Sequence, residues 1–206
     1  MDKFIGLTAV ACPLDAANLN TDQLIPARFL KLPRSAGLAT ALLRDLRFDA
    51  DGRERPDFPL NRPAWSDAKI LVGGRNFGCG SSREAAVYAL YDYGIRCVIA
   101  PSFGDIFAGN AVQNGLLTAI VSDDEAATLM GLVREKPGRP LAVDLEQQTI
   151  ECGDRSFHFV IDPVRRTRLL NGWDNIALTE SYIDQIAAFK MADRARRPWA
   201  APAKPE

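Results

Sequence analysis

The chain has 206 residues, of which 47% are hydrophobic and 25% charged, and its formal net charge is −1 at pH 7. This length suits one domain, or one domain with appendages, and the apolar fraction can fill a sizeable core. The balanced charge makes nucleic-acid binding unexpected, and no run is long and apolar enough to predict a membrane span. The segment from Met1 to Phe4 does not resemble a signal peptide, so a cytoplasmic location is expected.

Four cysteines are spread widely along the chain, at Cys12, Cys79, Cys97 and Cys152. No two of them form a C-x-x-C pair, so their spacing predicts neither a disulfide framework nor a complete metal site. It also fits no iron–sulfur cluster, so we expect this chain by itself to bind no metal ion or cofactor.

The first third of the sequence predicts one strand followed by a long irregular region. Residues 5–11 have the apolar content of a strand, and a polar loop follows at 18–22. The segment 27–34 is basic with interspersed apolar residues, as expected of a solvated surface loop. A short helix is predicted over 36–47. The charge and proline content of 49–63 indicates a long segment that lies outside the core.

The middle of the chain alternates between apolar strands and helices. The predicted order is strand 69–73, helix 82–93, strand 96–100, helix 103–114 and strand 116–121. Gly94 and Gly115 end the two helices, as glycine commonly does. This alternation favours a short parallel sheet with right-handed crossovers, and ligands of such sheets bind beyond the carboxyl ends of the strands.

The last third predicts a helix, an antiparallel meander and two more helices. The expected ranges are 123–135 for the first helix, 141–145, 149–152 and 156–161 for the strands, and 163–171 and 179–191 for the later helices. Residues 194–206 are rich in Arg, Pro and Ala without apolar periodicity, so a disordered tail is expected there. The sequence thus predicts one α/β domain over residues 1–193, with flanking helices and a β-rich flank.

The most informative stretch lies between a predicted strand and a predicted helix, and reads Arg75-Asn76-Phe77-Gly78-Cys79-Gly80-Ser81-Ser82-Arg83-Glu84. Gly78 and Gly80 permit positive φ and let a ligand approach the backbone closely. Ser81, Ser82 and Arg83 fall at the start of the helix, where free N–H groups and the helix dipole attract anions. Since the guanidinium of Arg83 suits a carboxylate or a phosphate, this stretch is predicted to be an anion site.

Other interpretations of these residue types remain open. Ser81 and Glu84 fit a capping box, Ser102 fits a cap of the second helix, and Asp22 fits a cap in the 18–22 loop. A nucleophilic serine is disfavoured because the stretch is not G-x-S-x-G, and because the single histidine, His158, lies far along the sequence in a position that suits a structural role. The phosphate-loop patterns G-x-x-x-x-G-K-S/T and G-x-G-x-x-G are also missing.

Four motifs together give the sequence a specific resemblance. Asn76–Glu84 resembles the signature of the swivelling domain of the aconitase superfamily, and in particular of the small subunits of 3-isopropylmalate dehydratase (isopropylmalate isomerase). Pro13–Asp22, Pro101–Phe107 and Asn171–Thr179 resemble the same family and run in its order, up to about residue 190. The resemblance implies the swivelling β/β/α fold of that superfamily, with a short parallel sheet.

The resemblance also implies roles for individual residues. Ser81 would be the catalytic base, with its alkoxide stabilised by helix N–H groups and by Arg83. Ser82 and Arg83 would hold a carboxylate of the substrate. Asp22 would belong to the acid site around the substrate.

A second family feature is the loop at residues 28–38, which would frame the variable group of the substrate. In the family, an arginine of this loop reaches a substrate carboxylate. Arg34 is the better match to that arginine, and Arg28 is the alternative.

The implied reaction is that of a hydro-lyase of leucine biosynthesis, which isomerises 2-isopropylmalate to 3-isopropylmalate through 2-isopropylmaleate. Moving the hydroxyl requires a base that removes a proton beside a carboxylate and a Lewis acid that takes the hydroxyl. In the family a separate large subunit supplies the Lewis acid as a [4Fe-4S] cluster, so we expect activity only in a heterodimer or larger assembly. The alternatives are a small subunit of homoaconitate, citraconate or dimethylmaleate hydratase, and a non-catalytic carboxylate-binding module.

Overall fold

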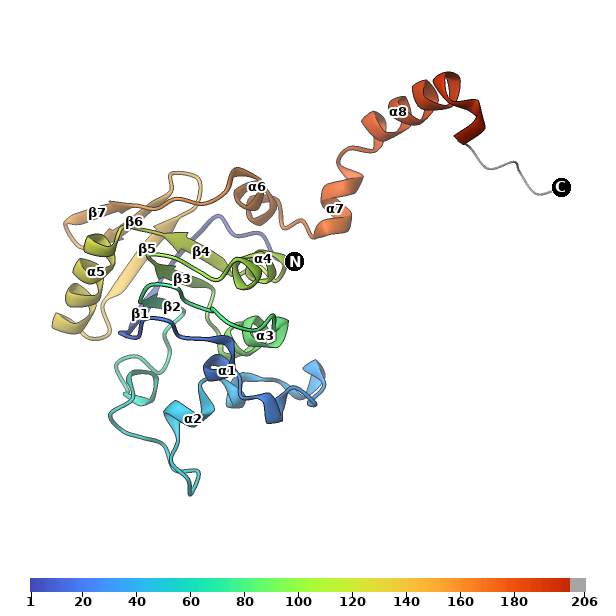
Figure 1. The fold of residues 1–206 in the computed structure, drawn as a ribbon. Helices are drawn as coiled ribbons and strands as arrows, with labels where there is room; N and C mark the ends of the chain where they lie inside the picture. Colours follow the sequence, from blue (N-terminus) through green and yellow to red (C-terminus); the bar gives the residue numbers. More distant parts are fainter. Residues whose placement is uncertain (201–206) are drawn as a thin grey trace.

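The computed structural model describes residues 1–200, which form a body built on a seven-stranded sheet and a projecting C-terminal arm (Figure 1). The strand order is β4-β3-β2-β1-β5-β6-β7. The strands are β1 (Gly6–Leu14), β2 (Ile70–Gly73), β3 (Cys97–Ala100), β4 (Leu117–Ile120), β5 (Pro140–Asp144), β6 (Thr149–Cys152) and β7 (Arg155–His158).

The parallel half of the sheet confirms the predicted β/α alternation. Strands β1 to β4 pair in parallel, with Leu71 of β2 opposite Cys12 of β1 on one side and Val98 of β3 on the other. Every residue of β2 and β3 is buried, which explains their uninterrupted apolar sequences. Strand β1 extends to Leu14, beyond the predicted end at residue 11, because its last four residues pair with β2.

The antiparallel half confirms the predicted meander. Strand β1 pairs with β5 on its other side, and β5, β6 and β7 follow as neighbouring hairpins. The sheet curls, because Ile120 at the end of β4 exchanges backbone hydrogen bonds of 3.1 and 2.7 Å with Val160, just after β7. The end of β4 therefore meets the segment that follows β7.

Helices cover both faces of this sheet (Figure 1). Helices α3 and α4 pack together on one face, and α5 packs against β1, β2 and β3 on the other. The helices are α1 (Thr21–Leu24), α2 (Arg44–Arg47), α3 (Glu84–Tyr93), α4 (Asp105–Gln113), α5 (Asp123–Glu135), α6 (Pro163–Asn171), α7 (Asn175–Glu180) and α8 (Ile183–Arg196). Within residues 1–200, no helix has the length and apolar content that crossing a membrane would require.

The single helix predicted over 36–47 is wrong. The segment contains two short 3₁₀ turns and α2, and these are interrupted by Gly37 at φ 73° and Leu43 at φ 51°. Leu42 and Leu43 are both fully buried, although they are adjacent in sequence. The N–H of Leu43 donates to the Leu24 carbonyl oxygen at 2.8 Å, so contacts with the body favour the broken backbone over helix propensity.

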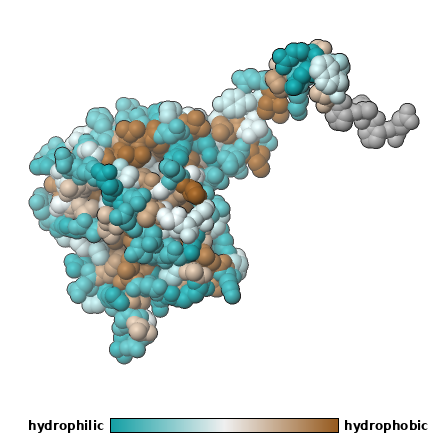
Figure 2. Space-filling view, in the orientation of Figure 1, coloured by the Kyte–Doolittle hydropathy of each residue, from teal (hydrophilic) through white to brown (hydrophobic). Residues whose placement is uncertain are grey.

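The C-terminal arm also differs from the prediction of one helix over 179–191 and a disordered tail from 194. Two helices, α7 and α8, are present instead, and a 3₁₀ turn follows at Pro198–Ala200. Helix α8 continues to Arg196, and Asp193 pairs with Arg196 and with the C-cap residue Arg197. The rest of the predicted tail, residues 201–206, lies outside the described part. No residue of α7 or α8 is buried, and exposed apolar side chains are visible along the arm (Figure 2).

Candidate active site

The glycine-rich turn after β2 adopts the backbone predicted for it. Gly78 has φ 71° and Gly80 has φ 90°, both in the region that favours glycine. A Cβ atom on Gly78 would collide with the ring of Phe107, and one on Gly104 would lie 2.6 Å from the Gly78 carbonyl oxygen. The turn is therefore held tightly against the start of α4, where only glycine fits.

The capping box considered as an alternative for Ser81 and Glu84 is not formed. Helix α3 begins at Glu84 with Arg83 as its N-cap, and no side chain caps it. The Glu84 carboxylate accepts a hydrogen bond of 2.9 Å from Asn114 and does not reach back to the serine. Ser81 and Ser82 are exposed, and neither hydroxyl hydrogen-bonds to another residue within 1–200. Both hydroxyls are thus available to a ligand.

The predicted cap at Ser102 is also wrong, because Gly104 is the N-cap of α4. The Ser102 hydroxyl instead accepts a hydrogen bond of 2.8 Å from the backbone N–H of Asn76. Its side chain therefore holds the beginning of the glycine-rich turn, a contact that the sequence pattern did not reveal.

The polar loop at 18–22 lies directly against the glycine-rich turn. The N–H of Gly78 donates to the Leu19 carbonyl oxygen at 2.7 Å, and the N–H of Thr21 donates to the Cys79 carbonyl oxygen at 2.9 Å. The Thr21 hydroxyl donates to the Ser81 carbonyl oxygen at 2.7 Å. Thr21 was not among the predicted site residues, yet it fixes the backbone of Ser81.

Asp22 is not the helix cap considered from the sequence. Asn20 is the N-cap of α1 and forms a capping box with Gln23. The Asp22 carboxylate instead lies 2.5 Å from Nη1 of Arg83. The structure thus brings together two predicted site residues that are 61 positions apart in the sequence.

Arg83 presents one edge of its guanidinium without a protein partner. Its side chain is only 16% exposed, and Nη1 contacts Asp22 and donates to the Ile25 carbonyl oxygen at 3.4 Å. The Nε and Nη2 atoms have no hydrogen-bond acceptor among residues 1–200. This edge is a planar fork that matches the two oxygens of a carboxylate.

The two arginines of the loop at 28–38 lie elsewhere and do not contact Ser81 or Arg83. Arg28 forms an ion pair with Asp45. Arg34 lies 3.9 Å from the centre of the Tyr88 ring, and its Nη1 donates to Asn114 at 3.3 Å. Arg34 therefore packs on the side of α3, one turn beyond the helix start.

A small hollow of about 220 Å³ opens beside Ser81. Its wall is formed by the glycine-rich turn and the start of α4, namely Gly78, Gly80, Ser81, Gly104, Asp105, Ile106 and Phe107. Asp105 was missed as a site residue, although it lies in the motif Pro101–Phe107 that carries part of the resemblance. The hollow is smaller than most pockets that enclose a ligand, which are about 300–1,000 Å³.

Other residues that could support a metal or a triad lie apart from this hollow. His158 is exposed on β7 and does not line it. Cys12, Cys97 and Cys152 are buried, and burial raises the pKa of Cys12 to about 12. Among residues 1–200, no three His, Cys, Asp or Glu side chains lie close enough together to hold a metal ion.

Comparison with known proteins agrees with this fold. Residues 1–124 match the family described as the aconitase C-terminal domain, and residues 127–163 match LeuD_N. The 3-isopropylmalate dehydratase small subunit of Rhodospirillum centenum is 49% identical over 97% of this chain and 99% of its own length. That of Rhizobium meliloti is 48% identical over 97% of this chain and 100% of its own length.

A solved structure is also similar. It is the crystal structure of 3-isopropylmalate dehydratase from Methanocaldococcus jannaschii, with a TM-score of 0.65 and 27% identity. The match covers 89% of this chain and 99% of that one. The resemblance that the four sequence motifs predicted is confirmed.

Proposed function

The chain belongs to the family of 3-isopropylmalate dehydratase small subunits, and we propose that it supplies the base and the carboxylate-binding residues of that hydro-lyase's active site. It is the small subunit of a hydro-lyase of leucine biosynthesis, which isomerises 2-isopropylmalate to 3-isopropylmalate. The observation that carries the proposal is the Arg83 guanidinium, clamped by Asp22 on one edge and open on the other, two residues from an exposed serine hydroxyl.

Ser81 is the base in this proposal. Its Oγ removes the proton from the carbon beside a substrate carboxylate, and the same oxygen returns a proton to the neighbouring carbon when water adds back. A serine hydroxyl is too weak an acid to act in this way unless its alkoxide is stabilised. The nearby positive charge of Arg83 and the N–H groups at the start of α3 supply that stabilisation.

Arg83 and Ser82 hold a substrate carboxylate. The open Nε and Nη2 edge of Arg83 binds the two carboxylate oxygens, and Ser82 donates a further hydrogen bond. Asp22 fixes the orientation of Arg83 through its ion pair. Arg34 lies on an exposed loop, and we propose that it reaches a second carboxylate when substrate is bound.

A second chain completes the site in this proposal. The hollow at Ser81, at about 220 Å³, is smaller than the usual ligand pocket, and within residues 1–200 no group of His, Cys, Asp or Glu side chains could hold a metal ion. The reaction needs a Lewis acid that accepts the hydroxyl. We propose that a large subunit supplies it as a [4Fe-4S] cluster, and that it docks over Ser81. No observation on this chain favours another hydratase substrate or a purely binding role.

Co-expression with a large subunit of the same organism tests the proposal. The purified pair is expected to convert 2-isopropylmalate, with formation of the unsaturated intermediate followed by its ultraviolet absorbance. The small subunit alone, at equal concentration, is the control and is expected to be inactive. Turnover by the single chain would refute the division of the site between two subunits.

A further inference from the structure

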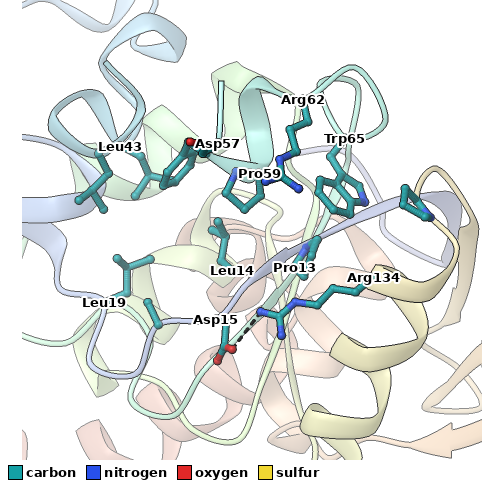
Figure 3. Close-up of a pocket in the computed structure, with 14 residues that line it drawn as sticks. Pro13, Leu14, Asp15, Leu19, Leu43, Asp57, Pro59, Arg62, Trp65 and Arg134 are labelled. Atoms are coloured by element: carbon teal, nitrogen blue, oxygen red, sulfur yellow. Dashed lines mark hydrogen bonds and ion pairs between the residues drawn. The ribbon is translucent and has the colours of Figure 1, made fainter. Parts of the chain in front are cut away.

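A larger hollow of about 530 Å³ lies between the end of β1, the segment 43–65 and α5 (Figure 3). It shares no lining residue with the hollow at Ser81. Most of its wall is apolar and comes from Leu14, Leu19, Leu43, Phe58 and Trp65. The volume suits a small molecule, and an apolar cavity with a few polar groups is the usual form of a ligand site.

Two charged side chains of this cavity have no ionic partner within residues 1–200. Arg62 and Asp57 flank Pro59 on one wall, and neither forms a salt bridge or a side-chain hydrogen bond there (Figure 3). On the opposite wall, by contrast, Arg134 is paired with Asp15 at 2.9 Å. Both side chains are exposed, so a ligand in the cavity can reach one cation and one anion beside a common apolar surface.

Trp65 adds a polar group that lacks a partner. The residue is only 5% exposed, and its indole N–H has no hydrogen-bond acceptor in the described part of the chain. A buried donor without an acceptor is unfavourable, and most such groups in proteins are satisfied. The Arg62 guanidinium lies 5.7 Å from the Trp65 ring centre, so both side chains lie at one end of the cavity.

The cavity wall is connected to the active-site loops by backbone contacts. Leu19 lines the cavity, and its carbonyl oxygen accepts the 2.7 Å hydrogen bond from Gly78 of the glycine-rich turn. Leu43 also lines the cavity, and its N–H donates to the Leu24 carbonyl oxygen at the end of α1 at 2.8 Å. At φ 51°, Leu43 has a strained backbone of the kind found at ligand clamps.

We propose that this cavity is a second binding site on the small subunit and takes a small apolar α-amino acid. Arg62 binds the carboxylate, Asp57 binds the ammonium group, and the apolar side chain lies against Leu14, Leu19 and Leu43. Occupancy alters turnover, because Leu19 and Leu43 are bonded to the loop and helix that hold Asp22 and the glycine-rich turn. The site goes beyond the proposed function, since none of its residues takes part in the isomerisation.

Calorimetric titration of the 206-residue chain with L-leucine tests the site. Saturable binding is expected for the wild type, and Arg62→Gln should weaken it about 10- to 100-fold through loss of a charge-assisted hydrogen bond. The matched control is Arg53→Gln. Arg53 is an exposed arginine of the same 43–65 segment that does not line the cavity, so this variant should bind L-leucine normally. No saturable binding, or equal loss in both variants, would overturn the proposal.

Two truncated probes separate the charged contacts. The amine 3-methylbutylamine lacks the carboxylate, so Arg62→Gln should leave its binding unchanged while Asp57→Asn weakens it. The acid 4-methylpentanoate lacks the ammonium group and should show the reverse. Loss of leucine binding in Arg83→Lys would place the ligand at the catalytic site instead, and so would refute a second site.

The assembled enzyme provides the last measurement. L-Leucine should change kcat or KM of the wild-type pair, whereas the Arg62→Gln pair should have normal basal activity and no response. Binding to the single chain but not to the pair would show that the large subunit covers the cavity, which would overturn the proposal. Whether L-leucine binds to the cavity does not depend on whether Ser81 is the base, so the two proposals can fail separately.

Discussion

Replacing Ser81 by alanine separates catalysis from helix capping. Ser81 is exposed, makes no side-chain hydrogen bond within residues 1–200, and lies two positions before the N-cap of α3. Its removal should therefore change the free energy of unfolding by no more than about 0.5 kcal/mol, whereas loss of a true N-cap costs about 1 kcal/mol. If Ser81 is the base, kcat should fall about 100- to 10,000-fold, which corresponds to about 3–5 kcal/mol of transition-state stabilisation.

The matched control is Ser122→Ala, because Ser122 is the N-cap of α5 and forms a capping box with Glu125. This change should lower the free energy of unfolding by about 1 kcal/mol and leave kcat unaltered. Thermal melts of each chain and steady-state kinetics of each assembled pair give both quantities. Near wild-type kcat in the Ser81→Ala pair, with normal assembly, would refute the assignment of the base.

Three further changes test the surrounding structure. Arg83→Lys keeps the charge but loses the fork, so KM should rise and kcat should fall in the assembled enzyme, and unchanged kinetics would argue against carboxylate binding there. Leu30→Asn, in the exposed loop at 28–38, should reduce the preference for isopropylmalate over smaller hydroxy acids by tens-fold, as measured by kcat/KM ratios, if this loop frames the isopropyl group. Gly78→Ala should destabilise the chain by about 3 kcal/mol in denaturant melts, because φ is 71° and the new methyl group meets the Phe107 ring. Gly109→Ala is its control: open space surrounds that position in α4, so the change should stabilise by about 0.5–1 kcal/mol.

Local sequence patterns were sufficient for the elements whose form depends on nearby residues. The apolar runs at 70–72 and 97–100 predicted neighbouring parallel strands, because strands buried on both faces need continuous apolar sequence. The positive φ of Gly78 and Gly80 was also predictable from the residue type, since only glycine adopts that backbone conformation freely. The family motif then predicted Ser81, Ser82 and Arg83 as site residues without any structure.

Contacts between distant segments could not be predicted, because no local signal encodes them. A capping box at Ser81 and Glu84 satisfies every local rule, yet the glycine-rich turn packs against Phe107 and the 18–22 loop, and the helix begins at Glu84 with Arg83 as its N-cap. Asp22 satisfies the rules for a cap as well, and only the tertiary structure shows that it pairs with Arg83.

The same limit explains the broken segment at 36–47 and the cavity beside it. Leu43 leaves the helical region because its side chain is needed in the core, and this is a property of the body against which it packs. The sequence by itself therefore determined the β/α alternation of the parallel half of the sheet and the positive φ of the glycine-rich turn. Tertiary packing decided which polar side chains meet, since that depends on contacts between residues far apart in the sequence, such as Asp22 with Arg83 and Asp15 with Arg134, for which backbone propensity gives no signal.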